Sequence, residues 1–210
     1  MRLGQNSVQS AMRVLPIISQ HTEMAAHLWL IRDRAVHAPH YDLKDLAKLD
    51  GRIDAHLDGL RVAGVEGLRL CVAGVNRAEP GTFFAAGSVA LEQKPEIFAE
   101  LLAWPAVDAS LARPLVTALC WAGGPASQAV TAEALRSGDA AARAVGVATA
   151  GCLRLPTDSL DGWLDRALRD DAPAVRSRGL RAVGEYGRVD LWRTIHGALT
   201  DADPLCRYWA

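Results

Sequence analysis

The chain has 210 residues, half of them hydrophobic, and its 23 basic and 24 acidic side chains leave a formal net charge of −1. This length suits one continuous helical array or two small helical units, and it is enough to bury a substantial core. The balanced charge provides no general attraction to polyphosphates or anionic lipids, so nucleic acid is disfavoured as a partner.

Sequence signals for a membrane span or for export are missing. No run of about 18 apolar residues occurs, and residues 1–18 contain no compact apolar block before a small-residue cleavage site. The four cysteines are far apart and form no C-x-x-C pair, so we expect buried thiols in a reducing cytosol rather than disulfides or a zinc cage. They are Cys71, Cys120, Cys152 and Cys206. A cytoplasmic location is therefore expected.

Two long helices are predicted near the N-terminus. Residues 1–17 show no clear hydrophobic period, and we expect a loose arm that ends at Pro16. The first helix is predicted over residues 22–37 and the second over residues 42–62, because both carry one apolar stripe at helical spacing. Asp42 is suited to cap the second helix. Neither helix can bury its stripe alone, so residues 18–64 are predicted to form an αα-hairpin.

From residue 65 the chain alternates short apolar segments with turns, which predicts a series of short helices. They are expected over residues 65–75, 82–91, 95–103, 111–121 and 130–135. We assign residues 65–210 to one helical array.

Three segments of this array repeat one pattern. They are residues 135–146 (LRSGDAAARAVG), 168–179 (LRDDAPAVRSRG) and 199–210 (LTDADPLCRYWA). Their offsets of 33 and 31 residues lie in the period range of stacked helix pairs. The pattern predicts an all-α fold: a right-handed α-solenoid of helix pairs, with the αα-hairpin at its N-terminal end.

An arginine recurs at one position of the three copies, as Arg143, Arg176 and Arg207. One interpretation is an internal ladder in which each arginine pairs with a loop aspartate of an adjacent copy, with Asp139, Asp171 and Asp203 as the candidates. The other is an exposed basic stripe that binds phosphate or an acidic peptide. The sequence leaves both open.

The repeated loop Asp, Pro, Val-Arg or Cys-Arg and small residues resemble HEAT-type repeats, including those of phycobilin lyases. The strings EMAAHLWLIR (residues 23–32), APHY (38–41) and HLDGLRVAG (56–64) resemble an uncharacterised proteobacterial HEAT-repeat family. Its members are often encoded near type VI secretion genes. The resemblance implies a context in secretion, and it implies no established activity.

The third copy stops a few residues into a helix that is predicted to open at Pro204. Leu205, Cys206 and Trp209 would then have no following helix to cover them. We expect the last repeat to be incomplete, because the chain is a truncated or divergent member of the family or because this end docks on another molecule. A homodimer through the C-terminal end is one form of such docking.

No motif indicates catalysis, and we expect neither enzymatic activity nor a cofactor. The H-E-x-x-H arrangement, the nucleophile elbow and glycine-rich phosphate loops are all absent, and no metal site is predicted. Aromatic and arginine side chains dominate binding hot spots, so we expect partner contacts at seven residues. These are Trp29, Arg32, His40, Tyr41, Arg143, Arg176 and Arg207.

The predicted function is a non-catalytic scaffold or adaptor that binds another protein, with type VI secretion as its context. The alternative is a nucleic-acid-binding protein of the HEAT-like DNA glycosylase type, which would need a strongly positive concave face. The state of the three repeated arginines separates the two: exposed and unpaired for nucleic acid, or paired with loop aspartates for a scaffold.

Overall fold

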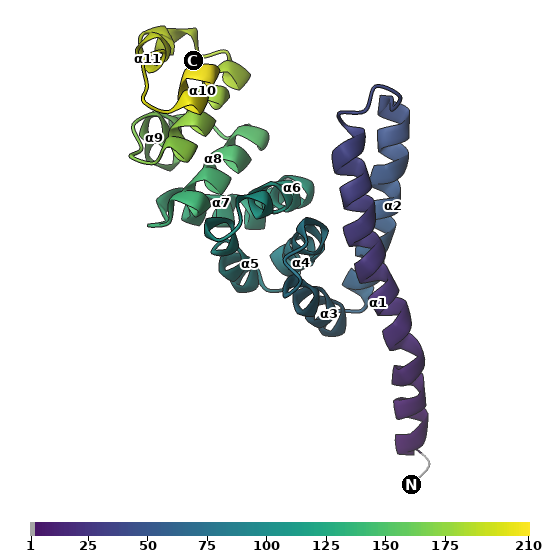
Figure 1. Cartoon of the computed structure of the whole chain (residues 1–210). Coiled ribbons are helices and arrows are strands. Elements are labelled where there is room, and N and C mark those ends of the chain that lie inside the picture. The colour runs from purple at the N-terminus through teal and green to yellow at the C-terminus, as the bar shows by residue number, and fades with distance from the viewer. Residues whose placement is uncertain (1–2) are drawn as a thin grey trace. The chain divides into compact units, whose positions relative to one another are not determined.

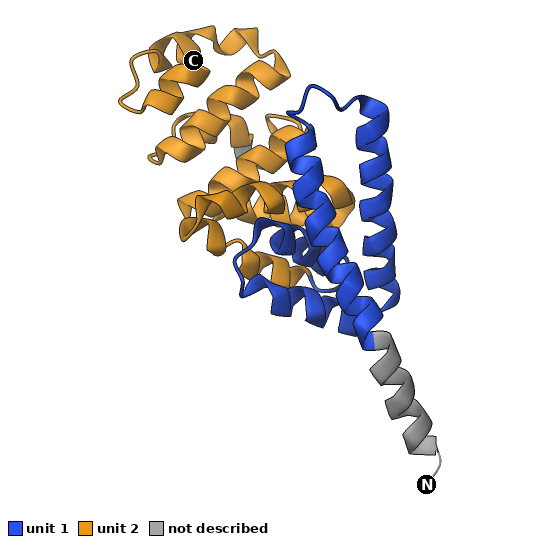
Figure 2. Ribbon diagram, turned by 45° about the vertical axis from the view of Figure 1, so that its right-hand side comes forward, with its two compact units in different colours: residues 1–94 blue, residues 95–210 orange. Residues whose placement is uncertain are grey.

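The computed structural model describes the backbone of residues 3–210 and the side chains of residues 15–160 and 162–210. This part of the chain is all-helical and contains no strand, as predicted. It divides into two compact units, Met1–Lys94 and Pro95–Ala210 (Figure 2). No helix among the described residues is long and apolar enough to cross a membrane.

The first unit contains four helices: α1 (Leu3–Ala35), α2 (Leu43–Val62), α3 (Val65–Val75) and α4 (Pro80–Gln93). α1 and α2 lie side by side as the predicted hairpin, and α4 packs against α1, α2 and α3 (Figure 1). The carboxylate of Asp42 accepts a hydrogen bond from the backbone N–H of Asp45 at 2.9 Å, which confirms it as the N-cap of α2.

Helix α1 extends further than predicted. It begins at Leu3 and continues through Pro16, where the sequence analysis placed a loose arm over residues 1–17. Residues 1 and 2 lie outside the described backbone. A proline removes one helical hydrogen bond and so weakens a helix locally without always ending it. Among the α1 side chains that are described, from residue 15 on, Ile18 is the first that is buried, two residues after this proline.

Helix α4 forms the centre of the first unit. All eleven of its residues from Gly81 to Leu91 are buried, so it is apolar on every side. The ring of Phe84 stacks on that of Trp29 from α1, with centroids 5.7 Å apart. A Cβ at Gly81 would lie 2.3 Å from the carbonyl oxygen of Ala26, so only glycine permits this approach of α4 to α1.

The boundary between the units differs from the predicted one. We expected the array to begin at residue 65, directly after the hairpin, but α3 and α4 belong to the first unit. The physical reason is that α4 is apolar all round and is covered by the hairpin as well as by α3.

The second unit contains eight α-helices within the described residues. They are α5 (Pro95–Leu101), α6 (Ala112–Ala122), α7 (Gly124–Arg136), α8 (Ala140–Cys152), α9 (Ser159–Leu168), α10 (Pro173–Tyr186), α11 (Trp192–Ala198) and α12 (Pro204–Trp209). Three 3-10 turns join them, at Trp104–Ala106, Ala109–Leu111 and Val189–Leu191. α8 packs on α6, α10 on α8 and α12 on α10, while α7 packs against α8 and α9 against α10.

Aspartates in the loops before α8 and α12 cap these helices. The carboxylate of Asp139 accepts from the N–H groups of Ala141 and Ala142, and Asp203 caps α12 in the same way. Ala172 occupies the equivalent position before α10, and its side chain forms no capping hydrogen bond.

The cysteine prediction was wrong for one pair. Cys120 of α6 and Cys152 at the end of α8 form a disulfide, with their Cα atoms 6.3 Å apart. The two cysteines are 32 residues apart, about one repeat, and the packing of α8 on α6 brings them together. Sequence spacing alone does not show which positions of successive copies become neighbours. Cys71 and Cys206 are unpaired and buried, as predicted.

Candidate protein-interaction surfaces

Arg143 forms one rung of a ladder between successive copies. Its Nε and Nη2 donate to the two carboxylate oxygens of Asp170, in the loop before α10, at 2.7 and 2.9 Å. Its Nη1 donates to the carbonyl oxygens of Ser137 and Gly138, in the loop before its own helix, both at 3.0 Å. The guanidinium therefore fixes two loops at once.

Arg176 repeats this arrangement one copy later. Its Nε and Nη2 donate to the carboxylate of Asp201 at 3.0 and 2.9 Å, and its Nη1 donates to the carbonyl oxygens of Asp170 and Asp171. Both rungs are about four-fifths buried, since the arginine side chains are 22% and 21% exposed. Hydrogen bonding to Arg143 lowers the pKa of Asp170, and that to Arg176 lowers the pKa of Asp201.

The ladder uses different aspartates from those we expected. The carboxylates of Asp139 and Asp203 cap helices α8 and α12. Asp171 accepts a hydrogen bond from Arg176 through its backbone carbonyl oxygen only. The acceptors Asp170 and Asp201 each stand three residues before the proline that begins the next helix, Pro173 or Pro204. Each also accepts the backbone N–H two residues further on, at 2.9 Å, so the loop itself orients the carboxylate.

Arg207 is the third of the repeated arginines. It forms the hydrogen bonds to the loop before its own helix but, within the described part of the chain, not those to a carboxylate. Its Nη1 donates to the carbonyl oxygens of Asp201 and Ala202 at 2.7 and 2.9 Å. Among the described residues no carboxylate bonds its Nε or Nη2, and the side chain is exposed. Arg143 and Arg176 thus take part in an internal ladder, whereas Arg207 presents its guanidinium outward.

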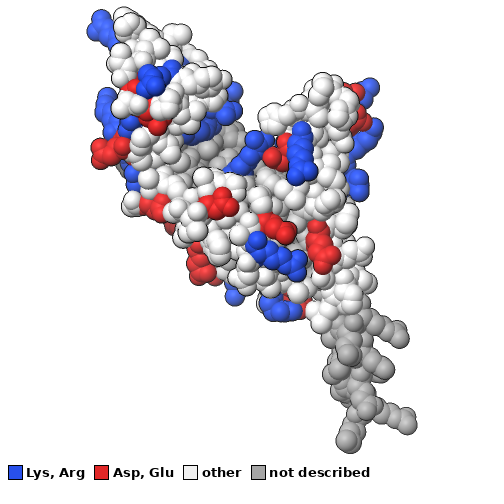
Figure 3. All heavy atoms as spheres, in the orientation of Figure 1, with Lys and Arg blue, Asp and Glu red and all other residues white. Residues whose placement is uncertain are grey.

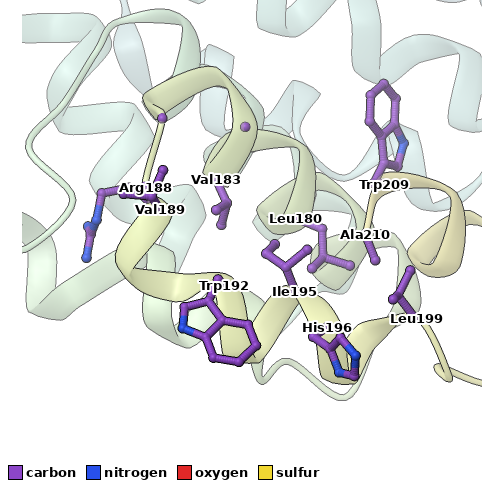
Figure 4. Close-up of a pocket in the computed structure, with 12 residues that line it drawn as sticks. Leu180, Val183, Arg188, Val189, Trp192, Ile195, His196, Leu199, Trp209 and Ala210 are labelled. Carbon is purple, nitrogen blue, oxygen red and sulfur yellow. The ribbon is translucent and has the colours of Figure 1, made fainter.

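An exposed apolar surface lies on α10, α11 and α12. It surrounds a hollow of about 470 Å³, whose base is formed by Leu180, Val183 and Ile195 (Figure 4). The indole of Trp192 and the imidazole of His196 lie next to each other along α11, with ring centroids 6.3 Å apart. We call this surface the C-terminal apolar face.

Large apolar side chains of the C-terminal apolar face are open to solvent. Val189 is 84% exposed, Tyr208 74% and Trp192 60%. Contiguous exposed apolar surface of this kind marks interaction sites in soluble proteins. The sequence analysis missed Trp192, although its spacing from Ile195 and Leu199 gives α11 an apolar stripe at helical spacing.

The predicted site on the first unit is only partly at the surface. Trp29 is 2% exposed and stacks in the core, so it leaves no surface for a partner, which corrects its assignment. Arg32 forms an ion pair with Asp50 at 3.0 Å. His40 and Tyr41 lie in the loop between α1 and α2, with ring centroids 4.9 Å apart, and His40 is exposed.

Two histidines meet inside the hairpin, which the sequence analysis did not foresee. Nδ1 of His21 lies 3.0 Å from Nδ1 of His56, so one ring donates and the other accepts. Burial, then the charges of His21 and Arg52, lowers the pKa of His56. Across the described residues no three His, Cys, Asp or Glu side chains gather in a way that could hold a metal ion.

Charge is mixed over the surface. On the face drawn in Figure 3, basic and acidic side chains are interspersed and neither sign forms a continuous field. No family model, curated protein or solved structure matches this chain. The surfaces described above are therefore the basis for the functional argument.

Proposed function

We propose that this protein is a non-catalytic scaffold that binds another protein through the C-terminal apolar face. The observation that carries the proposal is the exposure of Trp192 and Val189 at one apolar hollow, together with that of Tyr208 on α12, the helix whose Trp209 also lines the hollow. Aromatic side chains at the centre of such a surface supply most of the binding free energy in protein complexes. Arg207, also on α12, carries an exposed guanidinium with which a partner carboxylate can pair.

The architecture we propose for this scaffold is a right-handed α-solenoid of HEAT-like helix pairs. Successive packing of α6, α8, α10 and α12, together with the repeated arginine rungs, supports it. The family resemblance further suggests a partner in type VI secretion. We also expect a cytoplasmic location, although the Cys120–Cys152 disulfide counts against it because cytosolic thiols are kept reduced.

The nucleic-acid alternative has less support. It requires a basic concave stripe, but the guanidinium groups of Arg143 and Arg176 are paired with the carboxylates of Asp170 and Asp201. Arg207 alone provides too little charge for a phosphate-binding groove.

The test is capture from an extract of the source organism with the full chain as bait. We expect a stoichiometric protein partner that is lost with the double variant Trp192→Ser and Tyr208→Ser. The matched control is Leu43→Ser with Val62→Ser, because these side chains are 83% and 89% exposed on the first unit. Circular dichroism checks that both variants fold.

Light scattering completes the experiment, since a second copy of the chain is one candidate occupant of this face. A dimer of the 22.5 kDa chain that the Trp192 variant dissociates would identify it. Equal capture by both double variants would contradict the proposal, and so would a chain that binds only duplex DNA at moderate salt.

A further inference from the structure

Two hollows lie at equivalent positions of successive copies, and they differ greatly in size. The first, between α8 and α9, measures about 30 Å³, and the second, between α10 and α11, about 230 Å³. Corresponding residues line both of them. Leu135, Arg143 and Asp170 of the first hollow correspond to Leu168, Arg176 and Asp201 of the second.

Two side chains account for the difference in volume. In the first copy Trp163 lines the hollow: it is 1% exposed and its Nε1 donates to the carbonyl oxygen of Pro156 at 3.1 Å. Arg166 lies beside it and donates to the carbonyl oxygen of Leu135 at 2.9 Å. In the second copy the corresponding residues are Thr194 and Gly197, both exposed, and the space stays open.

The walls of the second hollow are already fixed. Arg176 is held by four hydrogen bonds from both sides of the rung. Leu168 and Leu180, which supply the apolar wall, are 9% and 3% exposed. A preformed site of this kind costs little ordering entropy when a side chain enters it. Thr194 and Thr200 also line it, and a threonine hydroxyl can accept a hydrogen bond from an indole N–H.

We propose that the hollow between α10 and α11 receives a tryptophan side chain of the protein partner, in the place that Trp163 occupies one copy earlier. The proposal deepens the scaffold function and rests on it, because it names the anchor residue by which a partner is recognised. An indole suits the site because the chain itself packs an indole between the same walls in the equivalent position.

The test is a titration of the ¹⁵N-labelled full chain with N-acetyl-L-tryptophanamide, followed by amide chemical shifts. We expect saturable shifts centred on Thr194, Gly197 and Ala198, with a dissociation constant on the order of 1 mM, as a single side chain provides. N-acetyl-L-alaninamide is the control ligand and should produce no saturable shifts.

Gly197 and Gly51 offer a matched pair of variants. A Cβ at either position meets nothing within 4 Å, so both substitutions are compatible with the fold. Gly197→Arg copies Arg166 and should weaken binding at least about tenfold, whereas Gly51→Arg, on α2 of the first unit, should leave it unchanged. Thr194→Trp, which copies Trp163, should abolish binding.

No saturable binding up to about 10 mM would overturn the proposal, and the hollow would then be a solvent-filled packing difference. Equal binding by Gly197→Arg and Gly51→Arg would overturn it as well. The scaffold function is tested separately by the Trp192 and Tyr208 variants. A partner that those variants lose but that Gly197→Arg retains would refute the tryptophan site and leave the scaffold intact.

Discussion

The two units are stabilised by different means. The first buries an entire helix, α4, among apolar neighbours, and ion pairs such as Lys48–Asp45 lie at its surface with side chains 75% and 41% exposed. The second stacks similar helix pairs and joins them by largely buried rungs such as Arg143–Asp170, whose side chains are 22% and 13% exposed. A core of unique large side chains fits in one way only. Similar copies can stack in more than one alignment, and a polar pair that forms in only one of them fixes the register.

The largest expected effect tests the core of the first unit. Trp29→Ala removes a fully buried indole that stacks on Phe84, and we expect it to lower the free energy of unfolding by about 3–5 kcal/mol. Urea unfolding measures this loss. Trp192→Ala is the control, because this indole is 60% exposed, and its effect should be small. Equal losses for the two variants would show that Trp29 is not a core residue.

Reduction should affect only the second unit. The Cys120–Cys152 disulfide closes a loop of about one repeat, and its loss should lower the free energy of unfolding by about 2–4 kcal/mol. Hydrogen exchange with and without dithiothreitol would locate the change in residues 95–210. A double Cys120→Ser, Cys152→Ser variant should be insensitive to the reductant. Four titratable thiols in the denatured, unreduced protein, instead of two, would disprove the disulfide.

The rungs can be compared within the repeats. Arg143→Ala leaves Asp170 buried without its cation, and we expect a loss of about 2 kcal/mol in the free energy of unfolding. Arg207→Ala should cost clearly less, because its Nε and Nη2 bond no carboxylate among the described residues. Urea unfolding measures both losses. Arg143→Lys serves as the variant that keeps the positive charge but loses the paired hydrogen bonds of the guanidinium to the carboxylate. Indistinguishable losses at the two positions would contradict the ladder.

The smallest effect concerns pH and the first unit. The pKa of His56 in the folded protein lies below its ordinary 6.5, so folding disfavours its protonated form. The contribution to stability is constant above about pH 6.5 and is lost as the pH falls through the folded pKa. We expect the melting temperature of the first unit to decrease between about pH 6.5 and 5. His56→Gln should remove this dependence, and an unchanged profile in that variant would assign it elsewhere.

Sequence periodicity was enough to predict the helical fold, the hairpin and the bounds of α2 and α3, because apolar stripes and caps are local signals. The boundary at residue 94 was missed, since it depends on which helices cover α4. Trp29 was misjudged for a related reason: its spacing fits the buried stripe of α1, and only tertiary packing shows that its ring is fully covered by Phe84 and its neighbours.

The three repeated arginines show which contacts a sequence repeat can predict and which it cannot. Their alignment identified Arg143, Arg176 and Arg207 as equivalent, but not which aspartate each one meets. Several acidic residues stand within one short loop, and the choice between Asp170 and Asp171 depends on a backbone turn that residue spacing does not encode. The hollow beside Arg176 became visible only by comparing two equivalent sites in three dimensions.

The rungs also constrain how such a chain gains or loses copies in evolution. A deletion that joins the codon of Arg143 to that of Ser177 removes one copy and fuses the start of α8 to the end of α10. The arginine keeps its own loop carbonyls and meets Asp201 in place of Asp170, so the shortened protein retains an intact rung. A deletion that does not remove a whole copy, 33 or 31 residues here, separates the arginine from its acceptor. The ladder thus sets the increment by which the gene can change length while its product still folds.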